Sequence, residues 1–278
     1  PMPMELIVFD LDGTLLDHSG SISDYTRDTL AALSERGVAY TVATGPTLHA
    51  ATDLLAPHGF RLPQVYKNAV MIWDPASDDY LHQNYLSHQE IKHILEAVLK
   101  QGVTPVIFSL EPDNRHVVYH SELKNDIEKK LADYFSERED LALLPAEQLP
   151  ATAEITNISA LGSPEVVNAI EQLIDSEPHL VAWSGVSWEG ENWRWIDIHH
   201  SDASKGGAIE TLREQLGVTH VVCFGDSDND LSMFSEADES YAPENASPEV
   251  KQAATRVIGH HNEDGIARFV RQRFNIDL

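Results

Sequence analysis

Short apolar runs and segments with helical spacing alternate along the first part of the chain. Residues 7–9 are apolar and predict a buried strand. Ser23 and Gly37 have the chemistry expected at the two ends of a helix, and residues 38–43 predict a second buried strand. A further helix is expected to open at Pro46. Strands that alternate with helices in this way predict an α/β fold with a parallel sheet.

The pattern changes after about residue 86. Strands expected at 104–110 and 116–120 follow one another without a helix between them, which is typical of an antiparallel sheet in an α+β unit. Residues 144–150 and 185–192 are expected to be loops.

From Trp193 the first pattern returns, with a strand at 193–199, a helix capped by Ser204 and an apolar strand at 221–225. We therefore predict two domains, since 278 residues can bury one large core or two smaller ones. Their expected extents are residues 1–85 with 192–278 for the parallel-sheet core and residues 86–191 for the inserted domain.

The net charge of the chain limits the classes of partner that it can bind. With 19 Lys and Arg against 45 Asp and Glu, the formal net charge is -26, which repels nucleic acid and anionic membrane surfaces. An anionic small substrate would also be repelled at long range. A site for such a substrate therefore needs local positive charge from a metal ion, a lysine or helix amino termini.

The cysteine count and the lengths of the apolar runs indicate in which cellular compartment the protein is expected. The single cysteine, Cys223, lies in an apolar run, so we expect it to be buried and unpaired. No apolar stretch approaches the ~20 residues needed to span a bilayer, and no signal-peptide pattern is present. The expectation is a cytoplasmic protein, either a monomer or a small homo-oligomer.

Acidic residues follow two of the predicted buried strands. Asp10 and Asp12 come directly after the first, and Asp226 follows strand 221–225. Each cluster alone is also typical of an acidic turn. The carboxyl ends of parallel strands, however, meet at one edge of a sheet, where ligands collect, and Mg²⁺ prefers carboxylate oxygens. The run after Asp226 lacks the glycine and glutamate that an EF-hand loop requires, so a calcium loop of that kind is excluded.

Candidate phosphate-binding residues lie at two predicted helix starts. Thr44 and Gly45 offer a hydroxyl and free backbone N–H groups, and Lys205 follows the Ser204 cap, although a single lysine is by default a solvated one. No P-loop motif occurs, so a P-loop nucleotide hydrolase is disfavoured. Asp10 is then the candidate nucleophile that attacks phosphorus, and Asp12 the residue that transfers the proton.

Four ordered motifs carry a resemblance to a known family. They are Asp10-Leu11-Asp12-Gly13-Thr14, Thr44-Gly45, Lys205-Gly206 and Gly225-Asp226-Ser227-Asp228-Asn229-Asp230. Together they resemble the motifs of the haloacid dehalogenase-like superfamily. Two later runs are similar to the ending of its Cof-type subfamily. They are Ala242-Pro243-Glu244-Asn245-Ala246 through Val250-Lys251, and Asn262-Glu263-Asp264-Gly265-Ile266-Ala267. The resemblance implies a Rossmann-like core with an inserted cap domain of the second type.

The resemblance also implies roles for individual residues. Asp10 would be the nucleophile and a Mg²⁺ ligand, Asp12 the general acid and base and a ligand through its backbone carbonyl, and Asp226 the third protein ligand. Phosphate would be held by the Leu11 backbone, Thr44, Gly45, Lys205 and Asn229. Asp230 would orient Lys205 or metal-bound water. The family pattern is broken at Pro46, where many relatives have Arg, and at Asn68-Ala69-Val70, where many have Asn-Gly-Ala.

Other aromatic and histidine residues are weaker candidates. Tryptophan can stack on a sugar or another ring, but it is usually a core or interface residue. The histidines have no clear ligand spacing, so surface or hydrogen-bonded histidines are expected. These residues are Trp183, Trp188, Trp193, Trp195, His116, His120, His199 and His200.

The resulting hypothesis is a Mg²⁺-dependent phosphatase that acts on a small phosphorylated metabolite, such as a sugar phosphate, through an aspartyl phosphate. Two alternatives remain open. One is a phosphosugar mutase or another phosphotransferase, and the other is a non-catalytic regulator that binds a phosphorylated metabolite. Neither nucleic acid nor a membrane is an expected partner.

Overall fold

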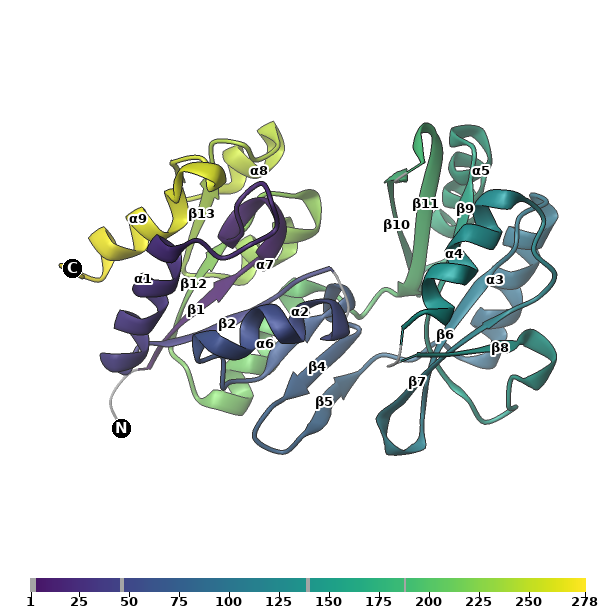
Figure 1. Cartoon of the computed structure of the whole chain (residues 1–278), viewed down its shortest axis with the longest axis horizontal. Coiled ribbons are helices and arrows are strands. Elements are labelled where there is room, and N and C mark those ends of the chain that lie inside the picture. Colours follow the sequence, from purple (N-terminus) through teal and green to yellow (C-terminus); the bar gives the residue numbers. More distant parts are fainter. Residues whose placement is uncertain (1–3, 46–47, 139–140, 188) are drawn as a thin grey trace. The chain divides into compact units, whose positions relative to one another are not determined.

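The computed structural model describes residues 4–45, 48–138, 141–187 and 189–278. It divides the chain into two compact units, one made of Pro1–His82 with Ala203–Leu278 and the other of Gln83–Asp202 (Figure 1). Among the described residues, no helix combines the length and the apolar character that a bilayer crossing needs.

The first unit is built on a parallel sheet of five strands. Their order across the sheet is β14-β13-β12-β1-β2, and every neighbouring pair runs parallel. The strands are β1 (Glu5–Phe9), β2 (Ala39–Val42), β12 (His220–Phe224), β13 (Glu239–Pro243) and β14 (Arg256–Ile258). The prediction of an α/β fold with a parallel-sheet core is therefore confirmed.

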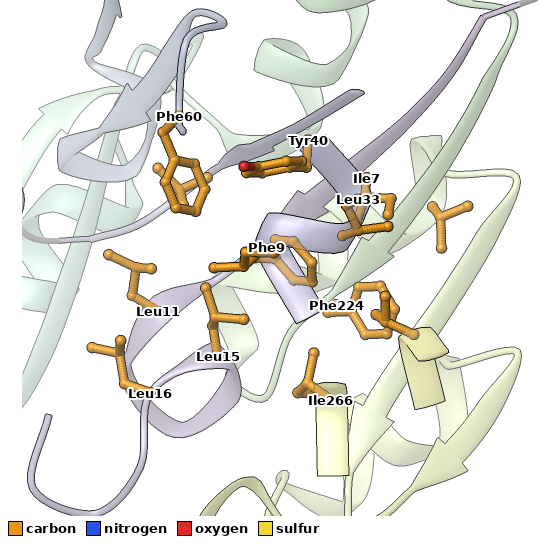
Figure 2. Close-up of a cluster of buried hydrophobic side chains, with 14 of the residues drawn as sticks. Ile7, Phe9, Leu11, Leu15, Leu16, Leu33, Tyr40, Phe60, Phe224 and Ile266 are labelled. Atoms are coloured by element: carbon orange, nitrogen blue, oxygen red, sulfur yellow. The ribbon is translucent and has the colours of Figure 1, made fainter. Parts of the chain in front are cut away.

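Both faces of this sheet are buried, because side chains alternate between two apolar clusters. Ile7 and Phe9 of β1 enter one cluster, while Leu6 and Val8 enter the other. In the first cluster, the rings of Phe9 and Phe224 stack with centroids 5.3 Å apart (Figure 2). Helices α1 (Asp24–Glu35) and α9 (Gly265–Arg273) cover this face, and α6 (Lys205–Leu216), α7 (Leu231–Glu236) and α8 (Pro248–Ala253) cover the other. The predicted Ser23 cap is confirmed by its hydrogen bond from the Thr26 N–H.

A smaller three-stranded sheet completes the first unit. It contains β3 (Gln64–Tyr66), β4 (Met71–Asp74) and β5 (Asp79–Gln83), and it follows helix α2 (Leu48–Leu55). The turn between β3 and β4 is unusual, since Lys67, Asn68 and Ala69 have φ angles of 49°, 53° and 75°. Ala69 thus takes a left-handed conformation, which residues with a Cβ atom rarely adopt and glycine adopts at no steric cost.

The second unit is a six-stranded sheet with helices. The strand order is β10-β11-β9-β6-β7-β8, antiparallel except for the parallel pair β7 and β8. Its strands are β6 (Val106–Glu111), β7 (Arg115–His120), β8 (Leu141–Pro145), β9 (Glu154–Gly162), β10 (Leu180–Ser187) and β11 (Gly190–His200). Its helices are α3 (His88–Lys100), α4 (Asp126–Ser136) and α5 (Pro164–Asp175).

Two sequence-based expectations about this unit are wrong. The region 185–192 is not a long loop, because β10 extends to Ser187 and β11 begins at Gly190 to form a hairpin. The strand expected at 193–199 does not return to the core, since β11 pairs with β9 and β10. The second boundary between the units therefore falls after Asp202 instead of at residue 192. Alternating residues predict a strand but do not say which sheet it joins.

Arg273 and three side chains at the amino ends of core strands form one network of hydrogen bonds. Arg273 of α9 donates from its terminal NH2 group to Glu5 Oε1 at 2.6 Å and to Glu239 Oε2 at 2.8 Å. His220 Nε2 lies 2.5 Å from the same Glu239 oxygen. The hydrogen bonds from Arg273 are the largest cause of a pKa for Glu239 that is lowered from 4.5 to about 2. Glu5, His220 and Glu239 open strands β1, β12 and β13, so the network stabilises the start of the sheet.

The substitution Glu239→Gln tests this network through its pH dependence. Because the folded-state pKa lies below the ordinary value, the carboxylate stabilises the fold fully at neutral pH and loses this effect as the pH falls toward 2. We expect the variant to lower the free energy of unfolding by about 1–2 kcal/mol at neutral pH. The difference from the wild type should shrink below about pH 4. Urea titrations at several pH values measure it.

The exposed Glu35 of α1 provides the matched control. Glu35→Gln should leave the free energy of unfolding unchanged across the same pH range. A loss in Glu239→Gln that stays constant with pH would show that the ionised carboxylate is not what stabilises the sheet here.

Candidate active site

A buried lysine connects two carboxylates at the carboxyl end of the core sheet. Phe9 and Phe224 are paired in register, so Asp10 and the segment from Gly225 leave the sheet beside each other. Lys205, at the start of α6, donates from Nζ to Asp230 Oδ1 at 2.7 Å and to Asp10 Oδ1 at 3.1 Å. Its side chain is 0% exposed. The lysine that could have been a solvated surface residue is therefore part of the buried site.

The electrostatics of this cluster follow from its burial. Burial raises the pKa of Asp10 to about 6, with Lys205 opposing the rise and Asp226 adding to it. Burial and the neighbouring Asp10 raise the pKa of Asp230 to about 7. Burial acts to lower the pKa of Lys205, but Asp10 and Asp230 outweigh it, so the pKa lies above its usual value and the ammonium stays charged. A permanent positive charge is thus held inside an acidic protein, where an anionic ligand needs it.

Asp226 is fixed by the loop that follows β1. The Thr14 hydroxyl donates to Asp226 Oδ1 at 3.0 Å. Gly13 has a φ of 75°, and a Cβ atom there would lie 2.2 Å from Asp226 Oδ2, so only glycine allows the approach. On the other side, Asp230 Oδ2 accepts from the backbone N–H groups of Asp226 and Ser227 at 3.0 and 3.1 Å. Asp230 therefore anchors both this loop and Lys205.

The acidic residues of the cluster fit a hard divalent cation. One carboxylate oxygen each from Asp10, Asp226 and Asp230 lie within 4.8 Å of one another. The oxygens of Asp230 already accept from Lys205 and from two backbone N–H groups, which leaves Asp10 and Asp226 as the better side-chain ligands. Two facing carboxylates repel each other, and a cation between them removes that repulsion.

Leu11 and Asp12, which directly follow Asp10, differ from each other in burial and in hydrogen bonding. The Leu11 N–H donates to Asp10 Oδ1 at 2.9 Å. Asp12 is exposed, and its side chain makes no hydrogen bond within the described ranges. Its carboxylate is therefore accessible to a bound ligand, and the backbone sets the direction in which the side chain leaves Cα.

The predicted phosphate-binding residues of the second motif lie beside this cluster. The Ala43 N–H donates to the Phe9 carbonyl at 2.9 Å, so Thr44 follows β2 next to the point where Asp10 follows β1. Gly45 lies close to two amides, since a Cβ atom there would be 3.5 Å from Asn68 Oδ1 and 3.9 Å from Asn229 Nδ2. Asn229 Nδ2 in turn donates to Asn68 Oδ1 at 2.8 Å.

Three neighbours of the site were not assigned a role from the sequence. Thr14 binds Asp226, Asn68 binds Asn229, and Asn245 Nδ2 donates to the Gly13 carbonyl at 2.8 Å. Thr14 could have been found from its place directly after the first acidic pair. The contacts of Asn68 and Asn245 depend on residues far along the chain.

The weaker aromatic and histidine candidates lie in the second unit. The described ones are on strands β7, β10 and β11, and His199 is fully buried there, which lowers its pKa. Pro46 and Trp188 lie outside the described residues.

Comparisons with known proteins agree with this geometry. The model of the haloacid dehalogenase-like hydrolase family matches residues 7–270. A 5-amino-6-(5-phospho-D-ribitylamino)uracil phosphatase of Bacillus subtilis is 26% identical over 274 residues, covering 98% of each chain. A pyridoxal phosphate phosphatase of Escherichia coli is 28% identical over 290 residues, covering 97% of this chain and 98% of the relative.

Solved structures share the fold. A haloacid dehalogenase-like hydrolase from Bacteroides thetaiotaomicron superposes with a TM-score of 0.76 at 21% identity, covering 98% of this chain and all of its own. A subclass IIB sugar phosphatase of the same superfamily superposes with a TM-score of 0.75 at 20% identity, covering 99% of this chain. Since the family model spans nearly the whole sequence, the chain belongs to the haloacid dehalogenase-like hydrolase family, as a phosphatase of its Cof type.

Proposed function

We propose that this protein removes phosphate from a small phosphorylated metabolite, with Asp10 as the nucleophile. The observation that carries the proposal is the buried Lys205 ammonium, which touches Asp10 Oδ1 at 3.1 Å. A phosphoryl group bound next to Asp10 would meet this charge directly. Interactions of this kind stabilise the negative charge that develops on the phosphoryl oxygens during transfer.

The reaction proceeds in two displacements. In the first, an Asp10 carboxylate oxygen forms a bond to phosphorus while the bond from phosphorus to the leaving oxygen breaks, and Asp12 gives that oxygen a proton. In the second, Asp12 takes a proton from water, the water oxygen attacks phosphorus, and Asp10 is released with inorganic phosphate. The exposed Asp12 carboxylate suits this exchange, because no hydrogen bond within the described ranges holds it.

The phosphoryl oxygens are held by charge and by hydrogen-bond donors. Lys205 supplies the charge, and Asp230 keeps the ammonium in place through its 2.7 Å hydrogen bond. The Thr44 hydroxyl, the backbone N–H groups of Gly45 and Leu11, and the Asn229 amide complete the set. Backbone N–H groups at strand-to-helix junctions bind anions. The Leu11 N–H would exchange its hydrogen bond to Asp10 Oδ1 for one to the phosphoryl group.

We propose that the divalent ion of this site is Mg²⁺. The carboxylates of Asp10 and Asp226 and the backbone carbonyl of Asp12 would hold it. When bound, it reduces the repulsion between the Asp10 carboxylate and the anionic substrate. The closely placed carboxylates support this assignment, since oxygen ligands with one or two carboxylates are what Mg²⁺ prefers.

The first unit is then the catalytic core and the second the cap that selects the substrate. The named relatives act on a phosphorylated ribitylaminouracil and on pyridoxal phosphate, and a structural neighbour is a sugar phosphatase. These compounds share a single phosphate ester on a small polar molecule. Small phosphate monoesters are therefore the proposed substrate class.

The variant Asp10→Asn tests the nucleophile. We expect kcat to fall by at least about a thousandfold, because the amide cannot form the aspartyl phosphate. The measurement is phosphate release from p-nitrophenyl phosphate in the presence of Mg²⁺. The matched control is Asp228→Asn, which removes an exposed carboxylate of the Asp226 loop and should keep wild-type activity. Wild-type turnover by Asp10→Asn would rule out the proposed mechanism.

The metal assignment has its own test. Chelation should abolish activity and added Mg²⁺ should restore it. In Asp226→Asn the Mg²⁺ concentration that gives half-maximal activity should rise by about tenfold or more, since one ligand loses its charge. Exposed Glu249→Gln serves as the control with unchanged Mg²⁺ dependence. Full activity of the chelated wild type would contradict a metal requirement.

A further inference from the structure

Residues of the C-terminal part of the chain form hydrogen bonds with the loop that carries the proposed catalytic acids. Asn245 Nδ2 donates to the Gly13 carbonyl at 2.8 Å, and the His261 N–H donates to Asn245 Oδ1 at 3.0 Å. His261 Nδ1 lies 2.7 Å from the Leu16 carbonyl. Asn245 belongs to a run that resembles the Cof-type ending, and His261 directly precedes the second such run. The reaction itself does not explain the role of these runs.

The orientation of the Asn245 amide follows from its partners. One end of the amide faces a backbone carbonyl, which only accepts, and the other faces a backbone N–H, which only donates. Rotating the amide by half a turn would lose both hydrogen bonds. Asn245 is thus a rigid bridge from residue 261 to Gly13.

This bridge ends one residue from Asp12. Since the Asp12 side chain makes no hydrogen bond within the described part of the chain, its direction depends on the backbone around it. That backbone turns sharply, with Asp12 at ψ 130° and Gly13 at φ 75°. Thr14 fixes the turn through Asp226, and Asn245 fixes the Gly13 carbonyl.

We propose that Asn245 is a positioning residue that aims the Asp12 carboxylate at the leaving oxygen through the Gly13 carbonyl. The inference rests on the proposed function, because it gives Asp12 the proton transfer. Loss of the bridge leaves Asp10, Asp226 and Lys205 in place. It therefore impairs protonation of the leaving group more than substrate binding.

Two variants separate the two ends of the bridge. Asn245→Asp keeps an oxygen for the His261 N–H but cannot donate to Gly13, and Asn245→Ala loses both hydrogen bonds. The control is Arg36→Ala, which removes two hydrogen bonds from the residue after α1 to the carbonyls of Phe274 and Asn275 near the C-terminal end. Circular dichroism and thermal unfolding check each fold, and the Asp variant carries the test if the Ala variant does not fold.

The readout compares two esters with different leaving groups. Phenyl phosphate has a poorer leaving group than p-nitrophenyl phosphate and depends more on protonation by Asp12. Both Asn245 variants should lower kcat/KM, which reports the first displacement, by about tenfold or more for phenyl phosphate and much less for p-nitrophenyl phosphate. The second displacement is common to both esters, so any loss of kcat that it causes is the same for both. Arg36→Ala should keep the wild-type ratio of the two kcat/KM values.

The outcomes are distinct. An unchanged ratio in Asn245→Asp overturns the positioning role, and so does an equal loss for both esters, which indicates general destabilisation. A changed ratio in Asn245→Ala alone would assign the effect to His261 and contradict the route through Gly13. A wild type inactive on both esters contradicts the proposed function and the positioning role with it.

Discussion

The buried contact of Lys205 with Asp10 and Asp230 is the constraint on which the rest of the site depends. A lysine whose side chain is fully buried keeps its charge only when carboxylates lie beside it, and the lysine in turn offsets the cost of burying the two carboxylates. Asp230 also holds the backbone of the Asp226 loop. These three charged side chains thus hold Asp10, Lys205 and the Asp226 loop together, the residues proposed as nucleophile, phosphate-binding cation and metal ligand.

The parallel sheet makes this contact possible. β1 and β12 are neighbours in register, so Asp10 and Asp226 follow adjacent strand ends although they are far apart in the sequence. Apolar side chains on both faces, such as Leu6 and Phe9, hold the strands rigidly between helices. A site built on strand ends keeps its geometry because the core beneath it is close-packed.

Much of this could be predicted from the sequence, and the failures have physical causes. Asp10, Asp226 and the Ser204 cap were predictable because strand and helix ends have local chemistry. The burial of Lys205 was not, since it depends on Asp230 across the fold. β11 was assigned to the wrong unit because alternation describes a strand but not its partner. The contact of Asn245 with Gly13 joins residues 232 positions apart, and no local pattern reports it.

The order of the strands also decides when this protein acquires its chemistry during synthesis. β1 lies between β2 and β12 in the sheet. Glu5 of β1 can pair with His220 of β12 only after His220 has been synthesised, and His220 follows the whole second unit in the sequence. Contacts between such distant segments form slowly, because a long loop must close first. A ribosome-bound chain that ends before residue 205 holds both amino-terminal acids without their lysine. The proposed site is therefore complete only after Asp226 and Asp230, which lie in the last quarter of the sequence, have also been made.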